Sequence, residues 1–302
     1  MQTIIYIVGF FILGYIARRF TTRPTHVAAW LNSYIIYVAM PSIILLKIPA
    51  LEFNPSMLIP AGFAWLWALI GGCMIIALCR FFRIAKPLEG AALLLTILGN
   101  TSFLGYPMVQ AFFNDTVLSY AIFYDQLGSF LILSTAGIIT IAVYAPNGSE
   151  QAINATRIAK RVMSFPPFLA LLIASFMPIE DLIIDLQPLL KLFSATLMPI
   201  ALLVIGLQFQ PQLLPEHRLP LLSAISLKMI MAPLLAYLAL TATSAATPIT
   251  QATVFEAAMP CMITPGIMAI QAGLSPRFCA TLIGYSTLFS FLWLPLIAVL
   301  IG

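Results

Sequence analysis

Long apolar runs separated by short polar connections dominate the chain. Each run is about 20 residues long, which is the length that a helix needs to cross a bilayer. A transmembrane β-barrel would show short segments of alternating hydrophobicity instead. The pattern therefore predicts an all-α polytopic membrane protein with ten transmembrane helices, at approximately 3–17, 27–47, 57–80, 88–112, 117–144, 162–179, 186–209, 219–242, 249–271 and 277–301.

The fourth run is interrupted near its middle by Gly99–Ser102 and again by Gly105–Pro107. Proline removes a backbone donor, and glycine weakens a helix. Irregular backbone at membrane depth is tolerated where protein buries it or where it lines a wet cavity. The break therefore predicts half of a binding site. The alternative is a proline kink whose hydroxyl groups bond back to the helix.

A repeat places a second break in the ninth run, at Met259–Gly266. Met40-Pro41 and Met198-Pro199 lie 158 positions apart, and Pro107 and Pro265 are separated by the same distance. Two proline matches at one offset indicate a duplication of five spans. Because five is odd, the second copy enters the membrane from the opposite side, which is a common plan of secondary transporters. The predicted parts are a first repeat at 1–145, a cytoplasmic linker at 146–161 and an inverted second repeat at 162–302.

Charge fixes the class and the expected orientation. Of the 302 residues, 62% are hydrophobic and only 8% are charged, whereas charged residues make up about a quarter of a soluble domain. Lys47 is the main basic residue of the alternate loops, and Lys191 lies just inside the seventh run. The other basic residues that set the orientation are Arg18, Arg19, Arg23, Arg80, Arg83, Lys86, Arg157, Lys160, Arg161, Arg218 and Arg277. The positive-inside rule puts their loops in the cytoplasm and both termini in the periplasm of a bacterial inner membrane. The net charge of +4 thus reflects orientation and predicts no nucleic-acid partner.

Three ionisable residues lie inside predicted spans: Asp125, Lys228 and Glu256. Such residues are costly in lipid and usually face the bundle interior or a cavity, where each must find a partner or lose its charge. If Lys228 pairs with one acid, the other has no obvious partner and can carry a proton. Glu256 is the first candidate because it precedes the second break, and Asp125 is the alternative. A purely structural pair or triad is the competing interpretation.

Two broken helices that cross at mid-membrane would aim their N-termini at one point. Helix N-termini carry partial positive charge and free N–H groups, so an anionic substrate such as a carboxylate fits them. The side chains expected to add contacts are Asn100, Thr101, Ser102, Tyr106, Cys261 and Thr264. The sequence shows no hydrolytic triad, phosphate loop or metal-ligand spacing, so no enzyme, metal or cofactor is expected.

Several segments resemble the auxin efflux carrier family, in a bacterial member: GNTSFLGYP at Gly99–Pro107, FYDQLGSF at Phe123–Phe130, FEAAMP at Phe255–Pro260 and STLFSFLWLPL at Ser286–Leu296. The resemblance implies a fold like that of bile-acid/sodium symporters, in which a scaffold domain lies beside a transport domain with crossed broken helices. It also implies substrate contacts at Asn100, Thr101 and the Pro107 break, and at Pro260 and Pro265. Prokaryotic relatives are associated with malate, malonate and similar carboxylates, and the chain lacks the extended central loop of the plant carriers.

These observations predict a secondary active transporter of a small organic anion that works by alternating access and is linked to protons. Helices 1, 2, 6 and 7 would form the scaffold, and helices 3–5 and 8–10 would form the transport domain. A homodimer formed through the scaffold helices is a further hypothesis. A sodium-coupled organic anion symporter of the bile-acid type is the first alternative. A membrane ligand sensor that does not transport is the second.

Overall fold

The computed structural model describes residues 2–49, 54–145, 155–177, 180–209 and 218–302. Within these ranges every secondary-structure element is a helix or a helical turn, and two residues form an isolated β-bridge. Five of the elements are wide π-helical turns (η1, η3, η4, η5, η7), and η2 is a short 3₁₀ turn. The elements are α1 (Gln2–Phe20), α2 (Pro24–Tyr34), η1 (Ile35–Ala39), α3 (Met40–Lys47), η2 (Pro55–Met57), α4 (Leu58–Phe81), α5 (Lys86–Ile97), η3 (Thr101–Gly105), α6 (Tyr106–Phe112), α7 (Asp115–Phe123), η4 (Tyr124–Ser129), α8 (Phe130–Ile132), η5 (Leu133–Gly137), α9 (Ile138–Tyr144), α10 (Ala155–Met163), α11 (Pro166–Phe176), α12 (Glu180–Ala195), α13 (Leu197–Gln208), α14 (Arg218–Ser226), η7 (Leu227–Met231), α15 (Ala232–Ala242), α16 (Thr247–Ala257), α17 (Ile263–Gln271) and α18 (Pro276–Ile301).

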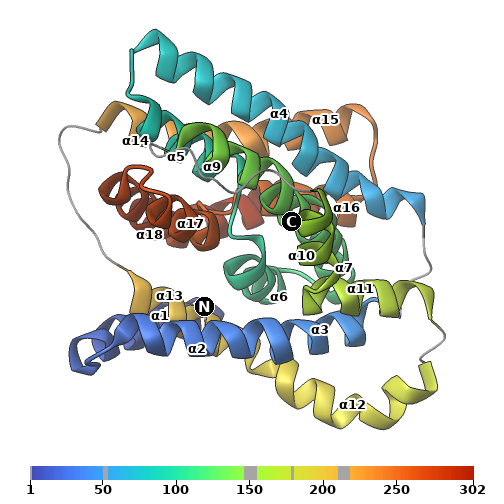
Figure 1. Ribbon diagram of the computed structural model, residues 1–302. Helices are drawn as coiled ribbons and strands as arrows, with labels where there is room; N and C mark the ends of the chain where they lie inside the picture. The colour runs from blue at the N-terminus through green and yellow to red at the C-terminus, as the bar shows by residue number, and fades with distance from the viewer. Residues whose placement is uncertain (1, 50–53, 146–154, 178–179, 210–217) are drawn as a thin grey trace.

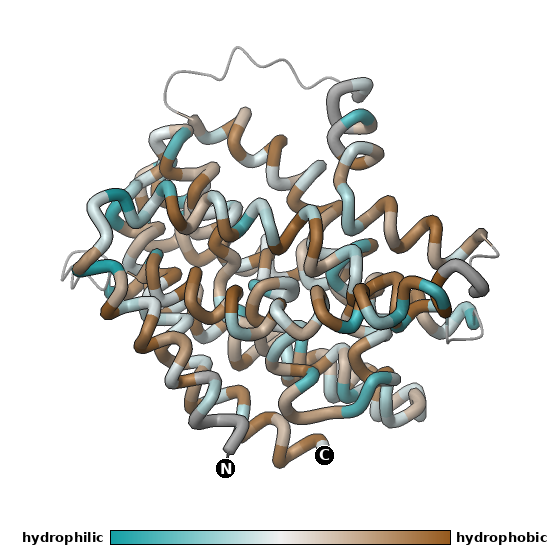
Figure 2. Tube along the Cα trace, turned by 90° about the horizontal axis from the view of Figure 1, so that it is seen from below, coloured by the Kyte–Doolittle hydropathy of each residue, from teal (hydrophilic) through white to brown (hydrophobic). Residues whose placement is uncertain are grey.

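Six helical runs in the described residues are long and apolar enough to cross a bilayer: Pro24–Lys47, Pro55–Phe81, Asp115–Tyr144, Ile183–Gln208, Arg218–Ala242 and Pro276–Ile301. Helix α11 is apolar but shorter, and two further runs, α5–α6 and α16–α17, are interrupted. Figure 2 shows hydrophobic colour along most helices, with hydrophilic stretches kept short. The chain is therefore a multi-pass helical protein, and the count of ten spans remains a prediction.

The helices fall into two packed groups. Helices α1–α3 pack against α11–α13, and α4–α9 pack mainly with α14–α18. Figure 1 shows the first group as the blue and yellow layer at the bottom, below the cyan, orange and red helices of the second group. We call them the first and the second helix group. The helices predicted for the scaffold lie in the first group and those predicted for the transport domain lie mainly in the second. The division into domains and repeats stays a prediction.

Proline explains three of the π turns. Pro41, Pro107 and Pro233 each lie two residues after the end of such a turn, at the start of α3, α6 and α15. A proline has no N–H to give to the carbonyl four residues earlier, and that carbonyl lies inside the preceding turn. The turn therefore widens at these points. A wide turn is a common feature of functional sites, and Lys228 and Asp125 both lie in one.

The predicted linker is partly helical. Residues 155–161 belong to α10, whereas 146–154 lie outside the described residues. The segment ATRIAKRVM places its basic and its apolar residues at helical spacing, which is the pattern of an amphipathic helix. The sequence predicts this segment only as part of a cytoplasmic linker.

Candidate functional site

The two breaks meet and complete each other's backbone. Helix α5 ends at Ile97 and α16 ends at Ala257, and the chain resumes helix at Thr101 and Ile263. Between them, the Asn100 N–H donates to the Pro260 carbonyl at 2.8 Å, and the Met262 N–H donates to the Leu98 carbonyl at 3.1 Å. An unpaired backbone group is costly at membrane depth. The crossing is thus a short antiparallel contact that pairs backbone groups which the interrupted helices leave free.

Asp125 lies beside the first break with a full set of donors. Its Oδ1 accepts from the hydroxyls of Thr101 and Ser102, the latter at 2.7 Å. Its Oδ2 accepts from the Tyr106 hydroxyl at 2.8 Å and from Gln126 Nε2 at 2.7 Å. An ionised carboxylate offers about four acceptor positions and no donor, so these four donors match it. The three hydroxyls at the first break that were expected to contact substrate therefore donate to Asp125, and they do not bond back to their own helix as a simple kink would require.

Glu256 is the opposite case. It is completely buried, and neither carboxyl oxygen has a hydrogen-bond partner. A Cβ at Gly105 would lie 2.6 Å from its Oε2, so Glu256 fits only because position 105 has no side chain. Burying an isolated ionised carboxylate costs far more than burying the neutral acid. Among the described residues, no hydrogen bond offsets that cost for an ionised Glu256.

Lys228 reaches the crossing from η7. Its Nζ donates to the carbonyl of Ala257 at 2.5 Å, and a Cβ at Gly99 would lie 3.0 Å from that Nζ. Ala257 is the last residue of α16, and the C-terminal carbonyls of a helix carry partial negative charge. Among the described residues Lys228 makes no ion pair with Asp125 or Glu256. Of the alternatives that the sequence leaves open for Lys228, the structure shows neither acid as its direct partner, because a helix end takes the ammonium group.

The backbone N–H of Asn100 has a hydrogen-bond partner, whereas its side chain has none. Its backbone N–H bonds across the crossing, yet neither its Oδ1 nor its Nδ2 has a partner, and the residue is fully buried. A buried amide without partners costs free energy, which a ligand or water can recover. Of the four polar residues that sequence analysis placed at the first break, Asn100 alone has its side chain uncommitted.

The remaining predicted contacts lie close to the crossing. The Cys261 N–H donates to Ser286 Oγ at 3.2 Å, and the Pro260 carbonyl takes part in the crossing. Thr264 is half-buried in the first turn of α17 and lines a small cavity of about 20 Å³. Pro107 and Pro265 are buried in the first turns of α6 and α17, where a proline contributes no backbone donor. The structure thus gathers the predicted residues in one region, most of it closed to water.

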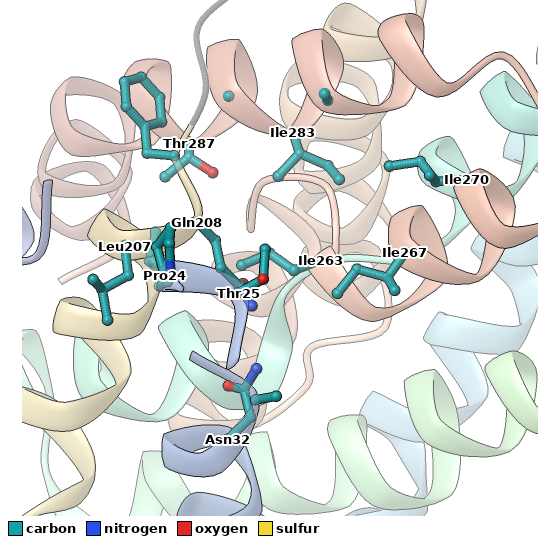
Figure 3. Close-up of a pocket in the computed structure, with 15 residues that line it drawn as sticks. Pro24, Thr25, Asn32, Leu207, Gln208, Ile263, Ile267, Ile270, Ile283 and Thr287 are labelled. Atoms are coloured by element: carbon teal, nitrogen blue, oxygen red, sulfur yellow. The ribbon is translucent and has the colours of Figure 1, made fainter. Parts of the chain in front are cut away.

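An open cavity of about 400 Å³ lies between the two helix groups and next to the small one. Figure 3 shows Asn32 directed into this space from α2, with Gln208 of α13 and Thr287 of α18 around it. These three residues are not among those that the sequence predicts for the site. The available signal was polar side chains within apolar runs, and nothing local in the sequence shows that they meet. Within the described ranges no cluster of three His, Cys, Asp or Glu side chains can hold a metal ion.

The two ends of the molecule differ. The cavity is bordered by Pro24, which follows Arg23, and by Phe209, whose carbonyl accepts from Arg18. The helical run Pro24–Lys47 carries the chain to the other end, about 36 Å away at 1.5 Å per residue. There Lys47 Nζ lies 2.6 Å from Asp115 Oδ2 and joins α3 of the first group to α7 of the second. The two groups are therefore in contact at the Lys47 end and separated by a cavity at the arginine end.

A family model described as membrane transport protein matches residues 1–161 and 151–298, and so almost the whole chain. The chain belongs to this family. The resemblance to the auxin efflux carrier family is thereby confirmed. The family name describes membrane transporters and not enzymes, in agreement with the helical multi-pass fold.

Two curated relatives are similar over part of the chain. A protein from Methanocaldococcus jannaschii, named an uncharacterized transporter, is 27% identical over 175 residues, which cover 56% of this chain and 54% of that protein. A second uncharacterized transporter, from Methanothermobacter thermautotrophicus, is 26% identical over 175 residues, covering 57% of this chain and 55% of that protein. The chain thus spans about half the length of the curated relatives that it matches.

Proposed function

We propose that this member of the membrane transport protein family is a secondary active transporter of a small organic anion. The observation that carries the proposal is the cavity between the two helix groups, next to the crossing of two broken helices. The helical segments that start at Thr101 and Ile263 have their N-termini at this crossing. Lys228 adds a buried cation. Partial and full positive charge together favour an anion.

The proposal includes ten spans arranged as two inverted five-helix repeats. The first helix group is the scaffold, and the second moves against it by alternating access. The basic residues at the cavity end are taken as cytoplasmic under the positive-inside rule, so both termini face the periplasm of a bacterial inner membrane. Under this orientation the cavity opens inward. The Lys47–Asp115 pair then holds the outer end closed, which gives a role to the main basic loop residue that did not fit the charge rule.

Glu256 is the proposed site of proton coupling. A buried carboxyl without any partner changes its proton affinity strongly when water or a cation reaches it. Movement of the second group would expose the crossing to each side in turn, and Glu256 would gain and release a proton with it. Asp125, with four donors, is proposed to hold the first break in shape instead.

The test is transport by the purified chain in proteoliposomes under imposed proton or sodium gradients, with malate, malonate and an aromatic monocarboxylate as labelled substrates. The proposal expects at least one acid to accumulate when a proton gradient is imposed. Accumulation only with sodium would establish the symporter of the bile-acid type. Binding without any movement of substrate by a folded protein would instead make the chain a sensor.

A further inference from the structure

Three of the four tryptophans donate an indole N–H to a backbone carbonyl in an irregular or interrupted helical segment. The bonds run from Trp65 to Leu127 in η4 (3.0 Å), from Trp67 to Thr96 near the end of α5 (3.1 Å) and from Trp293 to Met229 in η7 (2.6 Å). Indole groups thus supply donors where the helices leave their regular bonding pattern.

The Met229 carbonyl needs such a donor because Pro233 follows it by four positions. In a regular α-helix this carbonyl would accept from the N–H of residue 233, and proline has none. The Ala232 N–H bonds to the Leu227 carbonyl, five positions back, so the neighbouring bond does not fill the gap. In a membrane, neighbouring helices satisfy the backbone groups that a proline frees. Trp293 of α18 satisfies the Met229 carbonyl in this way.

The turn η7 is held from two sides at adjacent residues. Its backbone accepts from Trp293 at Met229, and the Lys228 Nζ donates to the Ala257 carbonyl at the end of α16. Lys228 is buried, and a Cβ at Gly99 would lie 2.9 Å from its Cε. The side chain therefore has little free space beside the first break. A shift of η7 would move the ammonium group away from α16 or press it against the break.

The Trp293 ring is itself fixed. It stacks on Phe289, one turn earlier in α18, with ring centroids 5.5 Å apart and an interplanar angle of 18°. A phenylalanine at position 293 can keep this stacking but has no N–H to donate. The substitution Trp293→Phe therefore removes the bond to Met229 with little loss of packing.

We propose that Trp293 is a positioning residue for Lys228. Through the Met229 carbonyl it fixes the turn from which the ammonium group reaches the end of α16. Trp293 itself touches no substrate, and its effect on an anion passes through Lys228. The consequence for uptake rests on the transport function proposed above, whereas the positions of η7 and Lys228 can be tested without it.

The test combines uptake with hydrogen exchange of the full-length protein in proteoliposomes. Labelled malonate and labelled phenylacetate are the probes for uptake, and mass spectrometry follows amide exchange. Trp293→Phe should raise the KM of the transported acid by about 3- to 10-fold, the value of a weakened hydrogen bond. Exchange should become faster at residues 227–234 and at 256–259.

A second substitution should reverse the effect. Pro233→Ala supplies a backbone N–H four positions after Met229, so it offers the carbonyl the donor that Trp293→Phe removes. The double variant Trp293→Phe/Pro233→Ala should therefore return the KM and the exchange rates towards those of the wild type. A loss of packing at Trp293 would not be repaired by a change on another helix.

Two controls separate positioning from general stability. Lys228→Met should by itself speed exchange at 256–259, and Trp293→Phe should add nothing further there, because no ammonium group remains to be positioned. Trp30→Phe makes the same change in a side chain that is 72% exposed on α2. This control should behave as the wild type in both assays.

The outcomes keep the two proposals apart. The positioning role is wrong if folded Trp293→Phe leaves exchange at 256–259 unchanged, or if it speeds that exchange equally with and without Lys228. Failure of Pro233→Ala to restore exchange in the double variant would also overturn it. If the wild type takes up neither acid, the transport function fails for these acids, and exchange at 256–259 alone decides the role of Trp293.

Discussion

Asp125 and Glu256 are two buried carboxyls next to one helix crossing, and they differ in their hydrogen-bond partners. Asp125 accepts four hydrogen bonds, three of them from the segment that follows the first break. Glu256 accepts none, and Gly105 of that same segment leaves the space it occupies. Residue type and depth are thus not enough to define a role. A carboxyl with all acceptor positions filled maintains a shape, whereas one without partners is free to respond to protons or ligand.

The largest expected effect is on Asp125. Asp125→Asn replaces one oxygen by an NH₂ group that faces the donors Tyr106 and Gln126, so buried donors lose their acceptor. Each such loss costs about 1–3 kcal/mol, and we expect the variant to lose roughly 3 kcal/mol or more of stability. Thermal unfolding in detergent measures this, with Glu256→Gln as the control that should unfold near the wild-type temperature. Equal stability of the two variants would remove the distinction between the carboxyls.

Asn100 tests whether the unpaired side of the crossing meets substrate. Asn100→Ala should leave the fold intact, because the side chain bonds to nothing, and should weaken substrate binding. A buried hydrogen bond to a charged ligand contributes about 1.5–3 kcal/mol, or roughly 10- to 100-fold in affinity. Calorimetric titration of the folded variant provides the number. Wild-type affinity would return Asn100 to a structural role.

Gly105 tests how closely Glu256 depends on the first break. Gly105→Ala places a Cβ 2.6 Å from Glu256 Oε2, and overpacking of this kind costs about 1–3 kcal/mol. The double variant Gly105→Ala/Glu256→Ala should regain part of that stability, since the clashing carboxyl is gone. A double-mutant cycle by thermal unfolding measures the coupling energy. Strictly additive effects would show that the two residues do not share the space.

Tyr106 should have the smallest effect. Tyr106→Phe removes one of the four donors to Asp125 and leaves the other three, so we expect a loss of about 0.5–1.5 kcal/mol and nearly unchanged transport. Substrate uptake and unfolding temperature are measured together. Loss of uptake by a stable variant would place Tyr106 in the substrate path, as the sequence alone suggested.

The sequence predicts the positions of the helix breaks better than it predicts which groups contact one another there. Gly99 weakens a helix and Pro260 removes a backbone donor from it, so the breaks can be located without a structure. Charge inside apolar runs identifies Asp125, Lys228 and Glu256 as buried. The partners depend on tertiary contacts. Lys228 bonds to the Ala257 carbonyl and to neither acid, because the end of α16 comes within its reach.

The polar residues that line the cavity illustrate the same limit. Asn32, Gln208 and Thr287 lie on three helices that are far apart in sequence, and no period or motif relates them. Only the packing of the helices brings their polar atoms to one cavity. Thr101 and Ser102 show the converse. Their polar motif predicts a binding site, but both hydroxyls donate to Asp125.

The central claim is that Glu256 couples proton movement to substrate transport. Measurement of both fluxes for the variant Glu256→Gln tests this claim most directly. Proteoliposomes with an enclosed pH-sensitive dye report proton flux, and labelled substrate reports uptake and exchange. Glu89→Gln is the control, because Glu89 is also buried but is bonded to Tyr144, and it should behave as the wild type. The account predicts that Glu256→Gln exchanges substrate for substrate but no longer accumulates it in a proton gradient. Accumulation by Glu256→Gln with the wild-type dependence on pH would contradict it.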